Sequence, residues 1–153
     1  MLTSAQVTIL RNAALADPVA VNYINNAQDQ LLADWLNTPQ PAFMAWRSTL
    51  TTDQARSAIM IGISQLDNLT VGKRDSLLWV FSVTTHPVDM TVTTAIDALC
   101  GTQNTLKGAL QDALRRPTTL AEKLLSSGTG TYASPAVMTY EGLFNAASAS
   151  SLR

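Results

Sequence analysis

Three capping boxes fix where helices begin in this chain, and they constrain its fold more than any other feature. In a capping box, a Thr side chain accepts a hydrogen bond from the backbone three residues on, and a Gln or Glu side chain reaches back. The three boxes are Thr3–Gln6, Thr51–Gln54 and Thr119–Glu122. Apolar residues at helical spacing follow each box. The sequence therefore predicts helices that begin near residues 3, 51 and 119.

Other helices are expected from periodicity alone. Apolar residues recur at helical spacing from Ala20 to Trp35 and again from Leu106 to Leu114. Arg115 and Arg116 place positive charge on the last turn of the second of these helices, where the helix dipole favours it. The short segment Pro41–Ser48 is interpreted as one or two turns of helix.

The segment Leu77–Val83 is apolar on every side. It is either the most buried helix or a central strand, and the charged residues that precede it without a turn favour a helix. Large aromatic side chains are expected in the core, because aromatics contribute much of core burial. Trp46, beside Arg47, is alternatively an anchor at a protein interface.

The chain changes character after Ser126. Gly, Ser and Pro punctuate the remaining residues, and large apolar side chains are dispersed among them. A disordered tail is one interpretation, but such tails usually lack aromatics and carry charge. The other is an arm that orders on a partner. The expected partner-contact residues of the arm are Gly128, Gly130, Tyr132, Pro135, Val137, Met138, Tyr140 and Phe144.

These observations together predict an all-α fold. We expect a compact bundle of six to eight helices over residues 1–126, followed by an extended C-terminal arm over residues 127–153. The hydrophobic share of 46% is ample for a core in a chain of 153 residues.

Charge and cysteine usage exclude several functions. Ten Lys and Arg against eleven Asp and Glu give a net charge of −1, which argues against a dedicated nucleic-acid binder and a polybasic membrane anchor. One cysteine and one histidine exclude an internal disulfide, a multi-Cys zinc site and a His-pair metal site. The sequence has no spanning apolar stretch and no signal-peptide pattern at its start, so an intracellular product is expected.

Signals for catalysis are weak. Ser82, His86 and Asp89 form a triad only on paper, because no nucleophile elbow surrounds the serine. Cys100 lies on an apolar helical face, where an inert thiol is expected. We therefore predict a non-enzymatic protein without catalytic, cofactor-binding or metal-binding residues.

A basic region around Arg115 and Arg116 is the densest positive charge in the chain. It is interpreted as a solvated helix end, or alternatively as a contact for an acidic protein surface or packaged nucleic acid. The possible interface residues of the body are Trp46, Arg47, Arg115 and Arg116.

Three stretches resemble small proteins from the structural-gene clusters of tailed bacteriophages and prophages. They are Pro41–Thr49, Val71–Asp75 running on to Phe81, and a third with Glu122–Leu125, Gly128–Gly130, Ala133–Ala136 and Tyr140–Gly142. The third is the most specific, and the order and spacing agree over roughly residues 20–145.

The resemblance implies a virion structural protein, most simply a head–tail connector, or adaptor, at the neck. Such adaptors are small helical proteins that form rings, typically of twelve, below the portal, and they often extend a terminal arm. The implied partners are further copies of the chain, the portal protein and a neighbouring tail or stopper protein, with DNA touched at most non-specifically and no membrane. The expected location is the virion neck, after synthesis in the host cytoplasm.

Two other functions remain open at this point. One is a different virion component, such as a tail-completion or head-decoration protein. The other is a helical regulatory module that binds a host protein.

Overall fold

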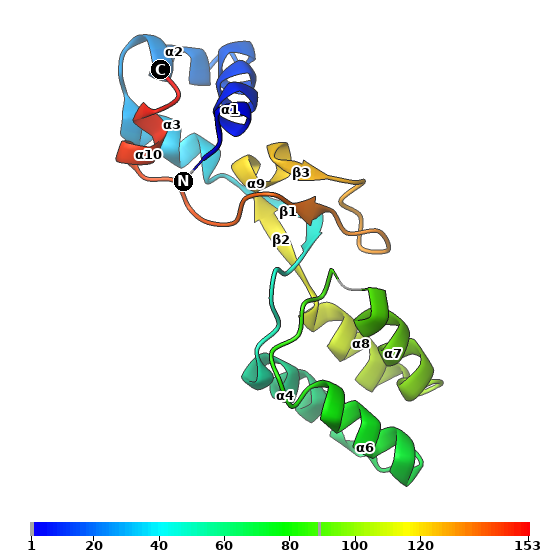
Figure 1. The fold of residues 1–153 in the computed structure, drawn as a ribbon. Coiled ribbons are helices and arrows are strands. Elements are labelled where there is room, and N and C mark those ends of the chain that lie inside the picture. Colours follow the sequence, from blue (N-terminus) through cyan, green and yellow to red (C-terminus); the bar gives the residue numbers. More distant parts are fainter. Residues whose placement is uncertain (1, 89) are drawn as a thin grey trace. The chain divides into compact units, whose positions relative to one another are not determined.

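The computed structural model describes residues 2–88 and 90–153 (Figure 1). Contacts within the chain divide it into two compact units. Unit 1 consists of Met1–Ala45 and Pro117–Arg153, and unit 2 consists of the intervening Trp46–Arg116. We describe each unit by itself.

The expected all-α fold is wrong. The structure is mixed: 54% of it is helical and 13% is strand, with two small antiparallel sheets. One sheet pairs β1 with β2 and the other pairs β3 with β4. The strands are β1 (Pro39–Trp46), β2 (Arg115–Thr119), β3 (Ser126–Ser127) and β4 (Val137–Met138).

The predicted helical turn at Pro41–Ser48 is also wrong, because most of that segment lies in β1. Pro39 and Pro41 each lack an N–H donor and fix φ, which disfavours a helix and suits an extended strand. Arg115 and Arg116 likewise begin β2 rather than ending a helix.

Unit 1 is built from short helices around a small core. Its helices are α1 (Ser4–Ala16), α2 (Ala20–Asn25), α3 (Asp29–Leu36), α9 (Leu120–Leu124) and α10 (Ala146–Ser150). The single helix expected over Ala20–Trp35 is divided in two, because Ala27 adopts a φ of 54°. Its core residues are Leu10, Ala14, Ala20, Leu32, Ala33, Leu36, Ala121, Leu125, Phe144, Ala149 and Leu152.

The extended C-terminal arm needs a correction in part, because its last residues fold into unit 1. Phe144 is 4% exposed, and α10 packs against α3. The side-chain amide of Asn37 donates to the carbonyl oxygen of Phe144, and its oxygen accepts from the Phe144 N–H, both at 2.8 Å. Phe144 thus finds its partners in the same chain, whereas Tyr132, Val137 and Leu143 are exposed.

Unit 2 is a helical unit. Its helices are α4 (Thr52–Ile61), α5 (Ile63–Leu66), α6 (Val71–Val80), α7 (Met90–Cys100) and α8 (Asn104–Ala113). α4 packs on α8, α8 on α7, and α7 on α6. The core between them includes Leu50, Ile59, Leu77, Phe81, Ile96, Leu106, Leu110 and Leu114.

The three capping boxes are confirmed. In each, the Thr side chain accepts from the backbone N–H of the Gln or Glu, whose side chain accepts from the Thr backbone N–H. A fourth box, formed by Asn145 and Ser148 at the start of α10, was not expected. Gly101, directly after α7, has the positive φ (53°) that glycine allows at the end of a helix.

Candidate functional site

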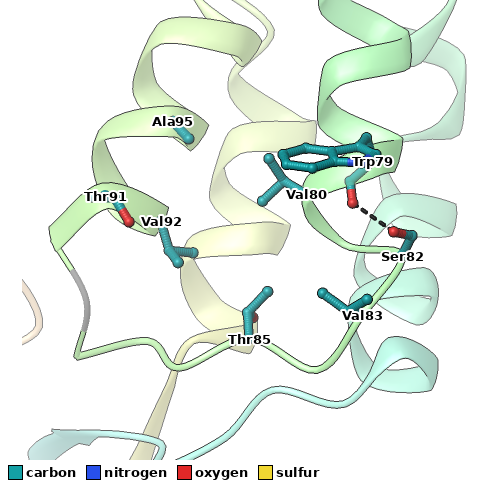
Figure 2. Close-up of a pocket in the computed structure, with 8 residues that line it drawn as sticks. All are labelled: Trp79, Val80, Ser82, Val83, Thr85, Thr91, Val92 and Ala95. Carbon is teal, nitrogen blue, oxygen red and sulfur yellow. Dashed lines mark hydrogen bonds between the residues drawn. The ribbon is translucent and has the colours of Figure 1, made fainter.

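A largely apolar groove lies between α6 and α7 of unit 2 (Figure 2). Its volume is about 470 Å³. The eight residues that line it are uncharged: Trp79, Val80, Ser82, Val83, Thr85, Thr91, Val92 and Ala95. We call it the Trp79 groove. Trp79 and Val80 project from α6 toward the side of α7 that bears Val92 and Ala95.

The spacing of residues along α6 explains why its apolar end is exposed. Residues four apart lie on the same helix face. Leu77 and Phe81 share the face that packs into the core, whereas Trp79 and Val83 lie away from it. The Trp79 side chain is 76% exposed. The segment expected to be the most buried helix is therefore a helix over most of its length but is buried on one face only.

The end of α6 and the segment that follows it are held by local hydrogen bonds. The Ser82 hydroxyl donates to the carbonyl oxygen of Trp79 at 2.7 Å. Leu50 and Thr85 exchange two backbone hydrogen bonds of 2.8 and 3.0 Å. The floor of the groove is thus built on paired backbone.

A second hollow lies between α4 and α8, with a volume of about 480 Å³. We call it the Ile61 groove, after a side chain that is 69% exposed. Small residues surround Ile61, and the polar and charged side chains complete the lining. Its lining residues are Arg47, Asp53, Gln54, Ser57, Ala58, Ile61, Ala109, Asp112 and Ala113.

These surfaces are suited to contact with another apolar surface. Exposed contiguous apolar patches on soluble proteins commonly mark protein–protein contact. The centre of an interface is depleted of charge and enriched in aromatics such as Trp. The Trp79 groove has both properties.

The triad that the sequence allows on paper is not assembled in the described residues. The Ser82 hydroxyl is bonded to Trp79, as above, and the His86 Nδ1 lies 3.2 Å from the carbonyl oxygen of Ser48. Asp89 lies outside the described residues.

Cys100 is buried, as expected for an inert thiol. Burial raises the pKa of its thiol, although the nearby charge of Lys107 acts in the opposite direction. Since the thiolate is the reactive form, this environment disfavours nucleophilic chemistry at neutral pH. Within residues 2–88 and 90–153, no three metal-ligating side chains cluster, and no helix is long and apolar enough to cross a membrane.

The four possible interface residues lie close together in unit 2. The Arg115 guanidinium stacks over the Trp46 ring at 5.3 Å and is 8% exposed. The Arg47 N–H donates to the carbonyl oxygen of Leu114 at 2.9 Å, and Arg116 is half-buried in β2. Trp46 and Arg115 thus form a contact inside the unit, and a role in binding a partner stays a prediction.

The expected partner-contact residues of the arm are distributed between core and surface. Gly130, Pro135 and Phe144 are buried, Met138 and Tyr140 are half-buried, and Gly128, Tyr132 and Val137 are exposed. Their role in contacting a partner is not tested by these positions.

Gly130 has a structural role in unit 1. Its φ is 67°, and a Cβ added there would lie 2.1 Å from the Phe43 ring. The Met44 N–H donates to the Gly130 carbonyl oxygen at 2.7 Å, and the Ala136 N–H donates to the Met44 carbonyl oxygen at 2.9 Å. The glycine-rich segment is thus paired with β1.

The Glu122 carboxylate links the start of α9 to the segment that contains Gly142. It accepts from the Thr119 N–H at 3.0 Å and from the Gly142 N–H at 3.1 Å. Glu122 is 2% exposed. Burial raises the pKa of the nearby Tyr140 phenol, and the charge of Glu122 raises it further. Glu122 and Gly130, two residues of the third resembling stretch, therefore have structural roles within unit 1.

Sequence reasoning missed the main residues of both grooves, Trp79, Val83 and Ile61. Trp79 was expected in the core with the other aromatics. The sequence held one signal for Trp79 and Val83, because the segment Leu77–Val83 is apolar on every side. In a small bundle a helix is covered by its neighbours on only part of its surface, so some of these apolar residues must be exposed.

No protein-family model, curated protein or solved structure matches the chain.

Proposed function

We propose that this chain is a non-enzymatic structural protein of a tailed-phage particle, in which it acts as a subunit of the ring that connects head and tail. Residues 41–49, 71–81 and 122–142 support the phage setting through their resemblance to proteins of phage structural-gene clusters. The exposed apolar surface of unit 2 supports the assembly role.

That surface is the observation on which the proposal depends. A water-exposed indole is unfavourable in a monomer, because burying a large apolar side chain gains about 1.5–3 kcal/mol. Trp79, near the end of α6, and Val83, in the segment that follows α6, are both well exposed. A second protein surface over the groove would recover that free energy.

The docking element of the proposal differs from the one expected from the sequence. The all-helical body shared with head–tail adaptors does not hold, and the end of the expected arm packs within unit 1. The lateral contacts are therefore assigned to unit 2, and the neck position rests on the resemblance.

The proposal is tested in the phage or prophage that encodes the chain. We expect mass spectrometry to find the protein in purified particles in several copies. Deletion of its gene should give filled or empty heads and free tails that electron microscopy shows unjoined, and expression from a plasmid should restore joined particles.

Two outcomes would contradict the proposal at different levels. If the protein is absent from purified particles and the deletion leaves them infectious, it is not a virion component. If heads and tails still join in the deletion but the particles are fragile or leak DNA, the protein is structural but not the connector.

A further inference from the structure

We infer that residues 145–153, which include α10, form a strap that covers α3 reversibly and is held closed by the ion pair between Arg153 and Asp29. We call these residues the strap. The strap opens while the rest of unit 1 stays folded, and in its closed form it blocks part of the apolar face of α3. The inference goes beyond the proposed function and does not depend on it.

The strap follows α3 from one end of that helix to the other. At the end of α3, the Asn37 side chain holds the Phe144 backbone through two hydrogen bonds of 2.8 Å. In the first turn of α3, the Asp29 carboxylate accepts from the Arg153 guanidinium at 3.1 Å. α10 lies between these two points in the sequence and packs on α3 (Figure 1). The first attachment thus holds the residue before the strap, and the second holds the strap itself.

Few apolar contacts hold the strap on α3. Ala149 and Leu152 are 0% exposed, and the other residues of the strap are half-buried or exposed. Ordering each residue costs backbone entropy, which burial has to offset. Phe144 gives unit 1 a buried aromatic ring, whereas the strap gives it one leucine side chain and the methyl group of one alanine. Because segments with few buried contacts open first, the boundary of the opening segment is expected directly after Phe144.

The polar groups of the strap bond mainly within the strap. The Asn145 side chain accepts from the Ser148 N–H at 2.8 Å, and the serine hydroxyls donate to carbonyl oxygens of the strap. Among the residues that the structure describes, the Arg153–Asp29 pair is the one hydrogen-bonded link between the strap and the rest of the chain. Opening therefore breaks one polar link and does not require the internal hydrogen bonds of the strap to break.

The Asp29 carboxylate makes this link dependent on Arg153. One carboxylate oxygen accepts from Arg153, and the other, Oδ1, is buried with no hydrogen-bond partner among the described residues. The Asp29 side chain is 22% exposed. Closure without Arg153 would leave a largely buried carboxylate with neither oxygen bonded, whereas opening returns the carboxylate to water. Loss of Arg153 therefore favours the open strap, and salt that screens the pair does the same.

Opening the strap uncovers apolar side chains of α3. Leu32 and Leu36 are four residues apart, so they lie on one face of α3, and both are 0% exposed. They belong to the same core as Ala149 and Leu152 of the strap. A segment of another molecule can reach this part of α3 only after the strap has left it. The closed strap is therefore an autoinhibitory cover over α3.

The first test is hydrogen exchange of the full chain, measured by NMR at low and at high salt. After correction for intrinsic rates, we expect the amides of Ala149 and Leu152 to exchange at least about tenfold faster than those of Leu10 and Ala14 in the core of unit 1. Arg153→Gln should increase the exchange of the strap about fivefold or more at low salt. It should also remove most of the salt dependence, because the screened pair is then absent.

Arg11→Gln is the matched control for this variant. It removes the same charge from an exposed position on α1. The exchange of the strap should therefore stay as in the unmodified chain. In both variants the exchange of Leu10 and Ala14 should be unchanged, because α1 stays folded when the strap opens.

The second test removes the large apolar side chain of the strap. Leu152→Ser should open the strap, and its urea midpoint should fall by less than half as much as that of Phe144→Ala, because only the weakly held strap is lost. Binding of the neutral apolar dye Nile red should increase relative to the unmodified chain, because the face of α3 that bears Leu32 and Leu36 is uncovered.

Three results would overturn the inference. Exchange of Ala149 and Leu152 at the rate of Leu10 and Ala14 would show that the strap opens only when unit 1 unfolds. Equal effects of Arg153→Gln and the Arg11→Gln control would show that the ion pair does not hold the strap closed. Unchanged Nile red binding by the Leu152→Ser variant would show that the strap covers no apolar face.

Discussion

Replacing Phe144 by Ala separates a packed segment from a docking arm. The Phe144 side chain is 4% exposed in the core of unit 1, and its ring centroid lies 5.2 Å from that of Tyr140. The two hydrogen bonds with Asn37 involve the Phe144 backbone and remain available to alanine. The substitution therefore removes side-chain packing and little else.

The expected cost is large relative to the stability of a small unit. Truncating a buried Phe to Ala costs about 3–5 kcal/mol, a range that includes the cavity left behind. Whole domains are stable by about 5–15 kcal/mol, so Phe144→Ala should remove at least about a fifth of this. With a urea slope of about 1–3 kcal/mol/M, the midpoint should fall by more than about 1 M.

The assay is urea unfolding, followed by circular dichroism and by Trp fluorescence. The other two Trp residues of the chain are replaced by Phe, so that the fluorescence reports only on Trp35 in unit 1. Leu143→Ala is the matched control, because Leu143 is the adjacent residue and is 73% exposed. It should change the stability by less than about 0.5 kcal/mol. Equal midpoints for the two variants would show that residue 144 is not part of the folded core.

Three further predictions concern unit 1. Glu122→Ala should lower the free energy of unfolding by about 1–3 kcal/mol for each buried N–H left without its acceptor, including that of Gly142, with Glu122→Gln intermediate in urea unfolding. Gly130→Ala should destabilise the chain through its positive φ and its overlap with the Phe43 ring, and a double-mutant cycle with Phe43→Ala should show that the second change relieves part of the cost. Backbone N–H groups that donate to the Asp17 carboxylate hold the pKa of Asp17 below its ordinary value of 3.8. The carboxylate therefore stabilises the fold above pH 3.8, and this contribution is lost as the pH falls through the lowered pKa. The thermal unfolding temperature of Asp17→Asn should depend less on pH over this acidic range.

Local signals predicted the helix starts correctly. A capping box is complete within four residues, so Thr3, Thr51 and Thr119 could be identified without knowledge of the rest of the chain. The strand β1 depends on pairing with β2, whose residues lie about seventy positions away in sequence. No local pattern reports such a partner, and the segment was assigned to helix from its apolar residues alone.

The candidate site was harder to predict than the fold. Periodicity identifies which residues of α6 share a face, but not how many faces its neighbours cover. Trp79 and Phe81 are both aromatic and two residues apart, and the structure exposes one and buries the other. The difference is decided by the position of α7 and α4 around α6, which is a tertiary property.

The residues that support the resemblance most specifically and the residues proposed for assembly have different roles. Gly130 is required by the Phe43 ring, and Glu122 is required by two backbone N–H groups, so these residues are explained by the folding of unit 1. A protein that resembles this chain in that stretch is therefore expected to share the fold of unit 1, whatever it binds. The assembly role depends instead on the apolar end of α6. Trp79 lines a groove there and is exposed, so its side chain is not part of the core of unit 2. Variants of unit 2 therefore test the assembly role more directly than variants of residues 122–142, because changes in that stretch also unfold unit 1.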